Sequence, residues 1–179
     1  MSADRPVAVA ILTVSDRCSR GEAVDRSGPA LGALVGTRLG ASIAGTACVP
    51  DDAEAIARQV RAWTSGDAAV DLVLTTGGTG LSPRDRTPEA IRPLLDREAP
   101  GLMELARAAT AATSPRSYLS RGIAGTIGRT LVLTLPGSVA GATEQCEALL
   151  GLLPHAIAIL RGEGGGHAMP AAREGRHGV

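Results

Sequence analysis

The residues best placed to do chemistry lie in a glycine-rich segment, Thr-Gly-Gly-Thr-Gly at 76–80, and in Asp85, which follows it. The apolar run 70–74 before this segment predicts a buried strand. Thr-Pro-Glu at 87–89 predicts a helix N-terminus, because Thr is a good N-cap and Pro suits the first helical position. The glycines leave backbone N–H groups open to close approach by a ligand. This order of strand, glycine loop, acidic residue and helix indicates an α/β site for a phosphorylated ligand.

Other phosphate-binding motifs do not fit this segment. A P-loop requires a Lys after its last glycine, and the chain contains no Lys, which also excludes Schiff-base chemistry. No G-x-G-x-x-G follows a strand, so a dinucleotide-binding site is not indicated. No His lies in a loop at a predicted strand end, which argues against a Ser-His-Asp hydrolase. The glycines are also compatible with a tight strand-to-helix connection that binds nothing.

Asp51 and Asp85 are the candidate catalytic pair. Each follows a predicted strand end and precedes a predicted helix. Two carboxylates there would repel a phosphate unless a divalent cation lay between them, so the pair indicates Mg²⁺. A structural interpretation remains open for both residues. Asp51 has the spacing of a capping box with Glu54 and could only cap a helix, and Asp85, which Arg84 and Arg86 flank, could be a solvated turn residue.

The elements that position these residues alternate between strand and helix, which predicts an α/β fold with a mostly parallel sheet covered on both faces. The expected strands are 7–14, 42–49, 70–74, 122–127 and 130–135. The last two should form an antiparallel hairpin around a tight Gly-Arg turn. Helices are expected at 28–39, around 56–63 and at 87–96. After a break at 100–101 a further helix should end at about 109, and the last helices are expected at 138–153 and 154–160. Ligands bind outside the carboxyl ends of parallel strands, so the polar clusters there should converge on one rim of the sheet.

Further polar residues lie beside these strand ends and could contact a ligand. Hydroxyls there could donate hydrogen bonds, and arginines could neutralise phosphate charge, although both also occur as ordinary turn and surface residues. The residues concerned are Ser15, Ser120, Ser138, Arg17, Arg84 and Arg121.

The composition excludes several classes of function. The formal net charge is zero, so no overall field would attract nucleic acid or an acidic membrane. No apolar run approaches the roughly 20 residues of a membrane span and the first residues are polar, so a cytoplasmic protein is expected. Three widely spaced cysteines argue against a disulfide framework and against a zinc site. One domain is expected at 1–161, and the segment 162–179, which lacks hydrophobic periodicity, is expected to be a disordered tail.

Several motifs in order along the chain resemble the molybdopterin adenylyltransferase family, which includes bacterial MogA and MoaB proteins and the N-terminal domain of gephyrin. The resemblance extends from about 7 to 161. Its most specific element is an apolar strand, Thr-Gly-Gly-Thr-Gly, four residues and then Asp85. The other matching motifs are Thr-Val-Ser-Asp-Arg (13–17), Asp-Arg-Ser-Gly (25–28), Val-Pro-Asp (49–51), Arg-Asp-Arg-Thr-Pro-Glu-Ala (84–90), Asp-Arg-Glu-Ala-Pro-Gly (96–101), Leu-Ser-Arg (119–121) and Leu-Pro-Gly-Ser (135–138).

The resemblance implies a three-layer α/β/α domain that transfers AMP from Mg-ATP to the terminal phosphate of molybdopterin. In that family the Asp of the Pro-Asp motif and the Asp closing the glycine signature are needed for adenylylation, and they correspond to Asp51 and Asp85, the expected Mg²⁺ ligands. The Ser of Leu-Ser-Arg contributes to the pterin site and corresponds to Ser120. The ligand-binding residues expected on this basis are Ser15, Asp16, Thr76, Gly77, Gly78, Thr79, Gly80, Ser120, Arg121, Pro136, Gly137 and Ser138.

The implied chemistry suits these residues. The nucleophile is a phosphate oxygen that is already ionised at neutral pH, so no general base is required, and the transfer depends on positioning and charge neutralisation. Gly77, Gly78 and Gly80 are expected to present backbone N–H groups to the ligands. Arg86 departs from the family pattern, because relatives usually have a small aliphatic residue there.

The resemblance also implies a homotrimer or a dimer of trimers, and a protein that inserts molybdenum as a partner. Some MoaB-type relatives lack the Pro-Asp carboxylate and do not adenylylate, and this chain keeps it. The alternatives are a MoaB-like protein that binds molybdopterin without transferring AMP, and an oligomeric scaffold. The sequence does not distinguish molybdenum from tungsten pathways.

Overall fold

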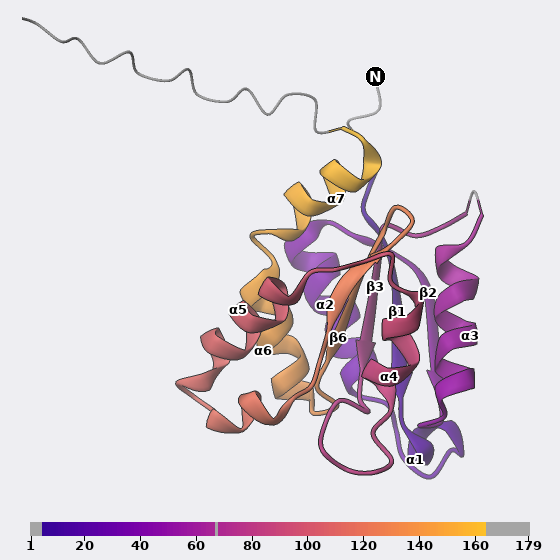
Figure 1. The fold of residues 1–179 in the computed structure, drawn as a ribbon, viewed down its shortest axis with the longest axis vertical. Helices are drawn as coiled ribbons and strands as arrows, with labels where there is room; N and C mark the ends of the chain where they lie inside the picture. Colours follow the sequence, from indigo (N-terminus) through magenta and orange to yellow (C-terminus); the bar gives the residue numbers. More distant parts are fainter. Residues whose placement is uncertain (1–4, 67, 164–179) are drawn as a thin grey trace, which may run out of the picture.

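The computed structural model describes residues 5–66 and 68–163, and it has the expected α/β fold (Figure 1). Within these residues, six strands form one sheet in the order β2-β1-β3-β6-β5-β4. Strands β2, β1, β3 and β6 run parallel, and β5 and β4 join the far edge in antiparallel pairing. The strands are β1 (Ala8–Val14), β2 (Ser42–Val49), β3 (Leu72–Thr76), β4 (Arg97–Glu98), β5 (Ala124–Ile127) and β6 (Thr130–Leu135).

Helices cover both faces of this sheet, which gives three layers. One hydrophobic cluster joins the sheet to α2, α5, α6 and α7, and a second joins the other face to α3 and α4. The helices are α1 (Asp16–Ser19), α2 (Ser27–Leu39), α3 (Ala53–Thr64), α4 (Thr87–Ile91), α5 (Pro100–Ala111), α6 (Val139–Leu149) and α7 (Leu153–Arg161), with 3₁₀ turns η1 (Arg92–Leu94) and η2 (Pro115–Leu119).

The central strand β1 explains why the first run of the chain is almost entirely apolar. Successive side chains in a strand point to opposite faces. Val9 and Ile11 therefore pack in the first cluster, and Ala10 and Leu12 pack in the second. Both faces of β1 are buried, so its positions are apolar except Thr13, whose hydroxyl donates to Asp25.

The hairpin prediction is confirmed, whereas two element boundaries were wrong. Strands β5 and β6 pair around Gly128, which has a φ of 57°. The expected helix 87–96 ends early: α4 stops at Ile91 and continues as the short turn η1, because Pro93 supplies no backbone N–H. The chain then forms β4, a two-residue strand that the sequence did not indicate. The expected helix 138–153 is divided into α6 and the start of α7.

The carboxyl ends of the parallel strands converge on one rim, as expected. Ser15 N–H donates to the carbonyl of Val49 at 2.9 Å, which ties the end of β1 to the end of β2. Gly77 N–H donates to the carbonyl of Leu135 at 3.2 Å, which ties the end of β3 to the end of β6. Residues from four strand ends are therefore held side by side.

An aspartate also lies at the opposite, amino-terminal rim. Asp71 precedes β3 and is 4% exposed. Its carboxylate accepts hydrogen bonds from Arg5 at 2.7 and 3.0 Å, from Arg161 at 2.7 and 2.9 Å, and from Ala8 N–H at 2.8 Å. Asp71 thus joins the segment before β1 to the last turn of α7.

The expected tail overlaps the folded part of the chain at its first residues. Most of the expected tail 162–179 lies outside the described residues, but Gly162 and Glu163 extend the folded part, because their N–H groups donate to the last carbonyls of α7. Among the described residues, none of the helices has the length and apolar character needed to cross a membrane. The three cysteines are free thiols.

Candidate functional site

The glycine segment after β3 forms a loop that only glycine can build. Gly77 and Gly78 have φ values of 104° and 63°, in the left-handed region that other residues rarely adopt. A Cβ on Gly77 would collide with the carbonyl oxygen of Val14, and one on Gly78 would collide with Oγ1 of Thr87. The loop therefore lies directly against β1 and the start of α4, with no side chain between them.

Thr87 holds this loop rather than capping a helix through its side chain, which corrects the sequence interpretation. Its Oγ1 donates to the carbonyl of Gly77 at 2.8 Å, and its N–H donates to the carbonyl of Gly78 at 3.0 Å. Thr76 acts similarly, since its Oγ1 donates to the carbonyl of Pro136 at 2.7 Å. Both threonines are fully buried, so they fix the loop between α4 and the end of β6.

The backbone N–H groups of the loop differ in availability. The N–H of Gly77 continues the pairing of β3 with β6, so the expectation that it faces a ligand was wrong. Within the described chain, the N–H groups of Gly78, Thr79 and Gly80 make no hydrogen bond. These three N–H groups can therefore donate hydrogen bonds to an anionic ligand.

Asp51 does not cap α3, which corrects the structural interpretation of this residue. Asp52 is the N-cap, and its Oδ1 accepts from Ala55 N–H at 2.8 Å. The Oδ1 of Asp51 is buried and has no hydrogen-bond partner among the described residues. Burial, followed by repulsion from Asp16, raises the pKa of Asp51 above its usual value. A buried carboxylate oxygen without a protein partner is suited to bind a ligand that is not part of the chain.

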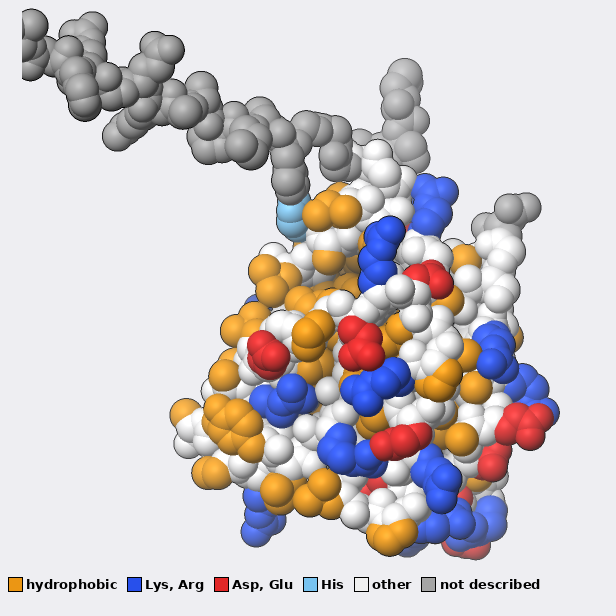
Figure 2. Space-filling model, in the orientation of Figure 1, with side chains coloured by type: hydrophobic (Ala, Val, Ile, Leu, Met, Phe, Trp, Pro, Cys, Tyr) orange, Lys and Arg blue, Asp and Glu red, His pale blue; other side chains and the backbone are white. Residues whose placement is uncertain are grey.

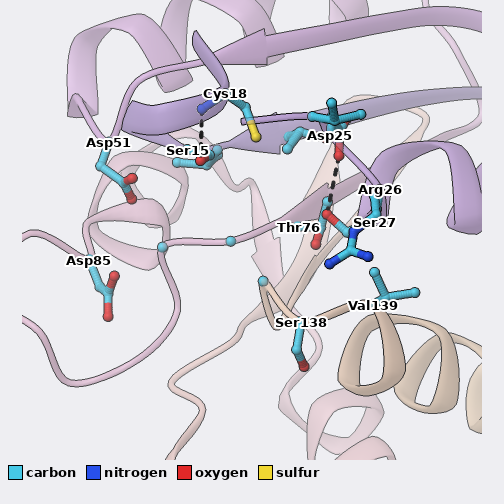
Figure 3. A pocket seen from close by; sticks show the side chains of 16 residues that line it. Ser15, Cys18, Asp25, Arg26, Ser27, Asp51, Thr76, Asp85, Ser138 and Val139 are labelled. Atoms are coloured by element: carbon cyan, nitrogen blue, oxygen red, sulfur yellow. Dashed lines mark hydrogen bonds between the residues drawn. The ribbon is translucent and has the colours of Figure 1, made fainter. Parts of the chain in front are cut away.

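Asp85 reaches the same place from the loop between β3 and α4. Its Oδ2 accepts from Ser82 N–H at 3.1 Å, and a Cβ on Gly80 would lie 2.7 Å from that oxygen. The Asp85 charge also contributes to raising the pKa of Asp51. Figure 3 shows the two carboxylates on the same side of the pocket, next to the glycine loop.

Asp16 supports Asp51 from the neighbouring strand end. Its Oδ1 accepts from the backbone N–H of Asp51 at 3.1 Å, and its Oδ2 pairs with Arg84. The hydrogen bond from Arg84 lowers the pKa of Asp16. Ser15 caps the short helix α1, where its Oγ accepts from Cys18 N–H at 3.3 Å. Arg84 is thus already paired with a carboxylate.

A hollow of about 760 Å³ opens in front of these groups (Figure 3). It brings together residues expected from the sequence, namely Ser15, Asp51, Thr76, Gly77, Gly78, Asp85, Gly137 and Ser138. Other residues that line it were not expected, namely Thr13, Val14, Cys18, Val24, Asp25, Arg26, Ser27 and Val139.

Asp25 organises the unexpected wall of this first hollow. It accepts from Oγ1 of Thr13 at 2.6 Å and from Gly28 N–H at 3.0 Å, and it lies between β1 and α2. The motif Asp-Arg-Ser-Gly at 25–28 was a signal for this wall. Its position at the rim could not be read from the sequence, because the segment 20–27 is a polar loop without periodicity.

A second hollow of about 480 Å³ adjoins the first and shares Gly78, Asp85, Gly137 and Ser138 with it. Thr79, Gly80, Ser120 and Pro136 line it as expected. Its remaining wall comes from α5, η2, α6 and the segments beside them, and was not expected. That wall consists of Thr110, Ser114, Arg116, Ser117, Leu119, Gly141, Glu144 and Gln145. Figure 2, in the orientation of Figure 1, shows side chains of both charges interspersed with hydrophobic ones on the visible face of the molecule.

Arg121 braces the loop between the two hollows. Its Nε donates to the carbonyl of Gly80 at 2.7 Å, one Nη donates to the carbonyl of Asp85 at 2.8 Å, and the other pairs with Glu89. Neither Arg121 nor Arg86 is among the described residues that line the two hollows. Ser120 lines the second hollow, and its Oγ donates to Oγ1 of Thr79 at 3.3 Å.

The carboxylates at this rim suit Mg²⁺ better than a metal ion that is held by protein ligands alone. The described part of the chain contains no group of three or more His, Cys, Asp or Glu side chains that could hold a metal. Mg²⁺ commonly takes one or two carboxylates and completes its shell with water and substrate phosphates. Asp51, with its unpartnered buried oxygen, and Asp85 fit that pattern.

The chain is similar to proteins of one known family. Residues 10–155 match the family described as a probable molybdopterin binding domain. Gephyrin of Dictyostelium discoideum is 42% identical over 163 residues, which covers 85% of this chain but only 22% of gephyrin. Molybdenum cofactor biosynthesis protein B of Staphylococcus epidermidis is 41% identical over 150 residues, which covers 82% of this chain and 84% of that protein.

Solved structures show the same fold. The crystal structure of the molybdopterin biosynthesis enzyme MoaB from Thermus thermophilus aligns with a TM-score of 0.81 at 48% identity, covering 87% of this chain and 97% of that one. The matched span contains the glycine loop, both carboxylates and both hollows. The chain therefore belongs to the molybdopterin-binding domain family of molybdenum cofactor biosynthesis proteins.

Proposed function

We propose that this protein transfers AMP from Mg-ATP to the terminal phosphate of molybdopterin and releases pyrophosphate. The observation that carries the proposal is the pair of adjoining hollows with Asp85 and Gly78 in their common wall. A transfer between two bound molecules requires two sites that meet at the reacting atoms. A single hollow with a single ligand would be equally compatible with a binding protein that transfers no group.

We place the nucleotide in the first hollow and molybdopterin in the second. The first hollow contains Asp51, and the second contains Ser120, which corresponds to the pterin-site serine of related proteins. The available N–H groups of Gly78, Thr79 and Gly80 lie between the two sites and would hold phosphate oxygens.

In the proposed reaction, an oxygen of the terminal phosphate of molybdopterin attacks the α-phosphorus of ATP. A new P–O bond forms, the bond between the α-phosphorus and the bridging oxygen breaks, and the electron pair leaves with pyrophosphate. No proton must be removed from the nucleophile, which agrees with the absence of His from the described residues that line the two hollows. The loop that Thr87 and Arg121 hold would keep the two phosphates aligned.

We propose Asp51 and Asp85 as the residues that hold Mg²⁺. The ion would neutralise phosphate charge that develops during the transfer. Burial holds the pKa of Asp51 high in the protein alone, so a cation would favour its ionised form. We further propose a cytoplasmic homotrimer, or a dimer of trimers, that passes its product to a molybdenum-insertion protein.

The test is an assay of purified protein with molybdopterin, ATP and Mg²⁺ that follows adenylylated molybdopterin and pyrophosphate. Wild-type protein should form both products, and Asp85→Asn should lower turnover by orders of magnitude while pterin affinity stays within a few-fold. An equal loss of turnover and pterin affinity in Asp85→Asn would assign this residue a structural role.

A pterin-binding protein without transferase activity is the second candidate, because the matching family is described as a probable molybdopterin binding domain, a description that names binding and no transfer. Folded wild-type protein that binds molybdopterin but forms no product would establish this function and contradict the transfer proposed here.

A further inference from the structure

Gln145 is an unusual residue in the seam between α5 and α6. Its neighbours on the buried face of α6 are Ala142, Cys146 and Leu149, which pack with Met103 and Ala106 of α5 in the hydrophobic core. The Gln145 side chain is 1% exposed, as buried as these apolar residues. A carboxamide at such a position carries donors and an acceptor into an apolar environment.

The amide of Gln145 is not satisfied by the protein. Its Oε1 is buried and accepts no hydrogen bond from the described residues, and its Nε2 donates none to them. A buried polar group without a partner destabilises a fold, so most such groups in proteins are paired. An apolar residue of similar volume would suit the seam better if packing were its whole function.

The position of Gln145 shows where a partner would lie. Gln145 lines the second hollow together with Thr110, Ser117 and Ser120. The hydroxyl protons of Thr110 and Ser117 are donated to backbone carbonyls of α5, at 2.9 Å and 3.0 Å, so these two hydroxyls face a ligand as acceptors. The amide of Gln145 would add both a donor and an acceptor to this wall.

We infer that Gln145 recognises the cyclic amide edge of the ring system bound in the second hollow. This inference rests on the proposed function, which places molybdopterin there. A pterin ring presents N–H donors beside a carbonyl acceptor on one edge, and a primary carboxamide can pair with such an edge through two hydrogen bonds. Gln145 is thus a specificity residue for the heterocycle and, unlike Asp51, does not line the first hollow.

The experiment measures binding of molybdopterin and of ATP separately, by titration of wild-type protein, Gln145→Met and Gln145→Glu. Met keeps the volume and removes all hydrogen bonding, and Glu keeps the shape and replaces the donor with an acceptor. Loss of one or two hydrogen bonds should raise the Kd for molybdopterin about tenfold in Gln145→Met. The Kd for ATP should stay within about twofold of wild type, because Asp51 and the first hollow are unchanged.

Thr75→Val is the matched control. Thr75 in β3 also has a buried Oγ1 without a partner among the described residues, but it is absent from the walls of both hollows. Its substitution should leave both affinities unchanged, and thermal melting of all variants verifies that they fold.

The outcomes separate this inference from the proposed function. A molybdopterin Kd for Gln145→Met within twofold of wild type would overturn the role of Gln145 even if AMP transfer occurs. A tenfold loss in a protein that transfers no AMP would support Gln145 and reject the transfer. Wild-type protein that binds no molybdopterin would overturn both.

Discussion

Two aspartates at opposite rims of the same sheet have opposite environments, one buried and one half-buried. Asp71, before β3, accepts five hydrogen bonds from Arg5, Arg161 and Ala8. Asp51, after β2, has a buried carboxylate oxygen with no partner in the described chain. The protein completes the first carboxylate internally and leaves the second incomplete.

The pKa directions express the same difference. Burial alone would raise the pKa of Asp71, but hydrogen bonds from Arg161, Ala8 and Arg5 outweigh it and hold the pKa below 3.8. Burial raises the pKa of Asp51, and its carboxylate neighbours Asp16 and Asp85 raise it further. Asp71 therefore stabilises the fold, whereas Asp51, the proposed Mg²⁺ ligand, is not stabilised in this way.

The largest expected effect is on activity, in Asp51→Asn. We expect turnover to fall about a thousandfold, because an amide cannot hold Mg²⁺ as a carboxylate does, and this corresponds to roughly 4 kcal/mol of transition-state stabilisation. The free energy of unfolding should stay equal or rise slightly, since an unpaired buried charge is removed. Product formation and urea unfolding measure the two quantities. A loss of stability together with activity would show that Asp51, like Asp71, stabilises the fold.

The second effect is on stability, in Asp71→Asn. Two arginines would lose their partner, one of them only 11% exposed, so we expect a loss of about 3 kcal/mol in the free energy of unfolding. Turnover of the folded protein should be unchanged because Asp71 lies at the rim opposite the hollows. Thermal melting and the transferase assay, the latter run below the melting temperature, verify this, and unchanged stability would contradict the assigned role.

The dependence of stability on pH should have opposite signs for the two residues. The pKa of Asp71 in the fold is lowered, so its stabilisation is present above 3.8 and is lost as the pH falls through the folded value. The pKa of Asp51 is raised, so its contribution is present below 3.8 and is lost as the pH rises through the folded value. Urea unfolding of wild type and both Asn variants over roughly pH 3 to 7 tests this. Parallel curves for the two variants would reject the assignment.

Asp52→Ala should have the mildest effect, and it separates the role of Asp52 from that of its neighbour Asp51. Asp52 caps α3, so we expect a loss of about 1 kcal/mol in the free energy of unfolding. Turnover should stay within about twofold of wild type, because the side chain is exposed and directed to the helix. A large loss of turnover would mean that the cap also positions Asp51.

Much of the fold could be predicted because its signals are local. The almost entirely apolar run of β1 indicates a strand buried on both faces, and the Gly-Arg turn indicates the hairpin of β5 and β6. Strand β4 could not be predicted, because its two residues are held by pairing with β5 and not by any preference of their own. The length of α4 depends on where Pro93 interrupts the backbone hydrogen bonds.

The glycine loop could be predicted from the residues alone, because only glycine readily adopts the conformations of Gly77 and Gly78, and so could the places of Asp51 and Asp85 after strand ends. Which of Asp51 and Asp52 caps α3 could be resolved only in the folded chain, since both have suitable spacing and it is Asp52 that accepts from Ala55 N–H, while Oδ1 of Asp51 is buried without a partner among the described residues. The tertiary structure also decided that Gln145 and Asp25 reach the site. The neighbours of Gln145 in the chain carry no signal of a ligand, and the motif that contains Asp25 did not show where this residue would lie, because the two hollows exist only where helices remote in sequence meet the rim.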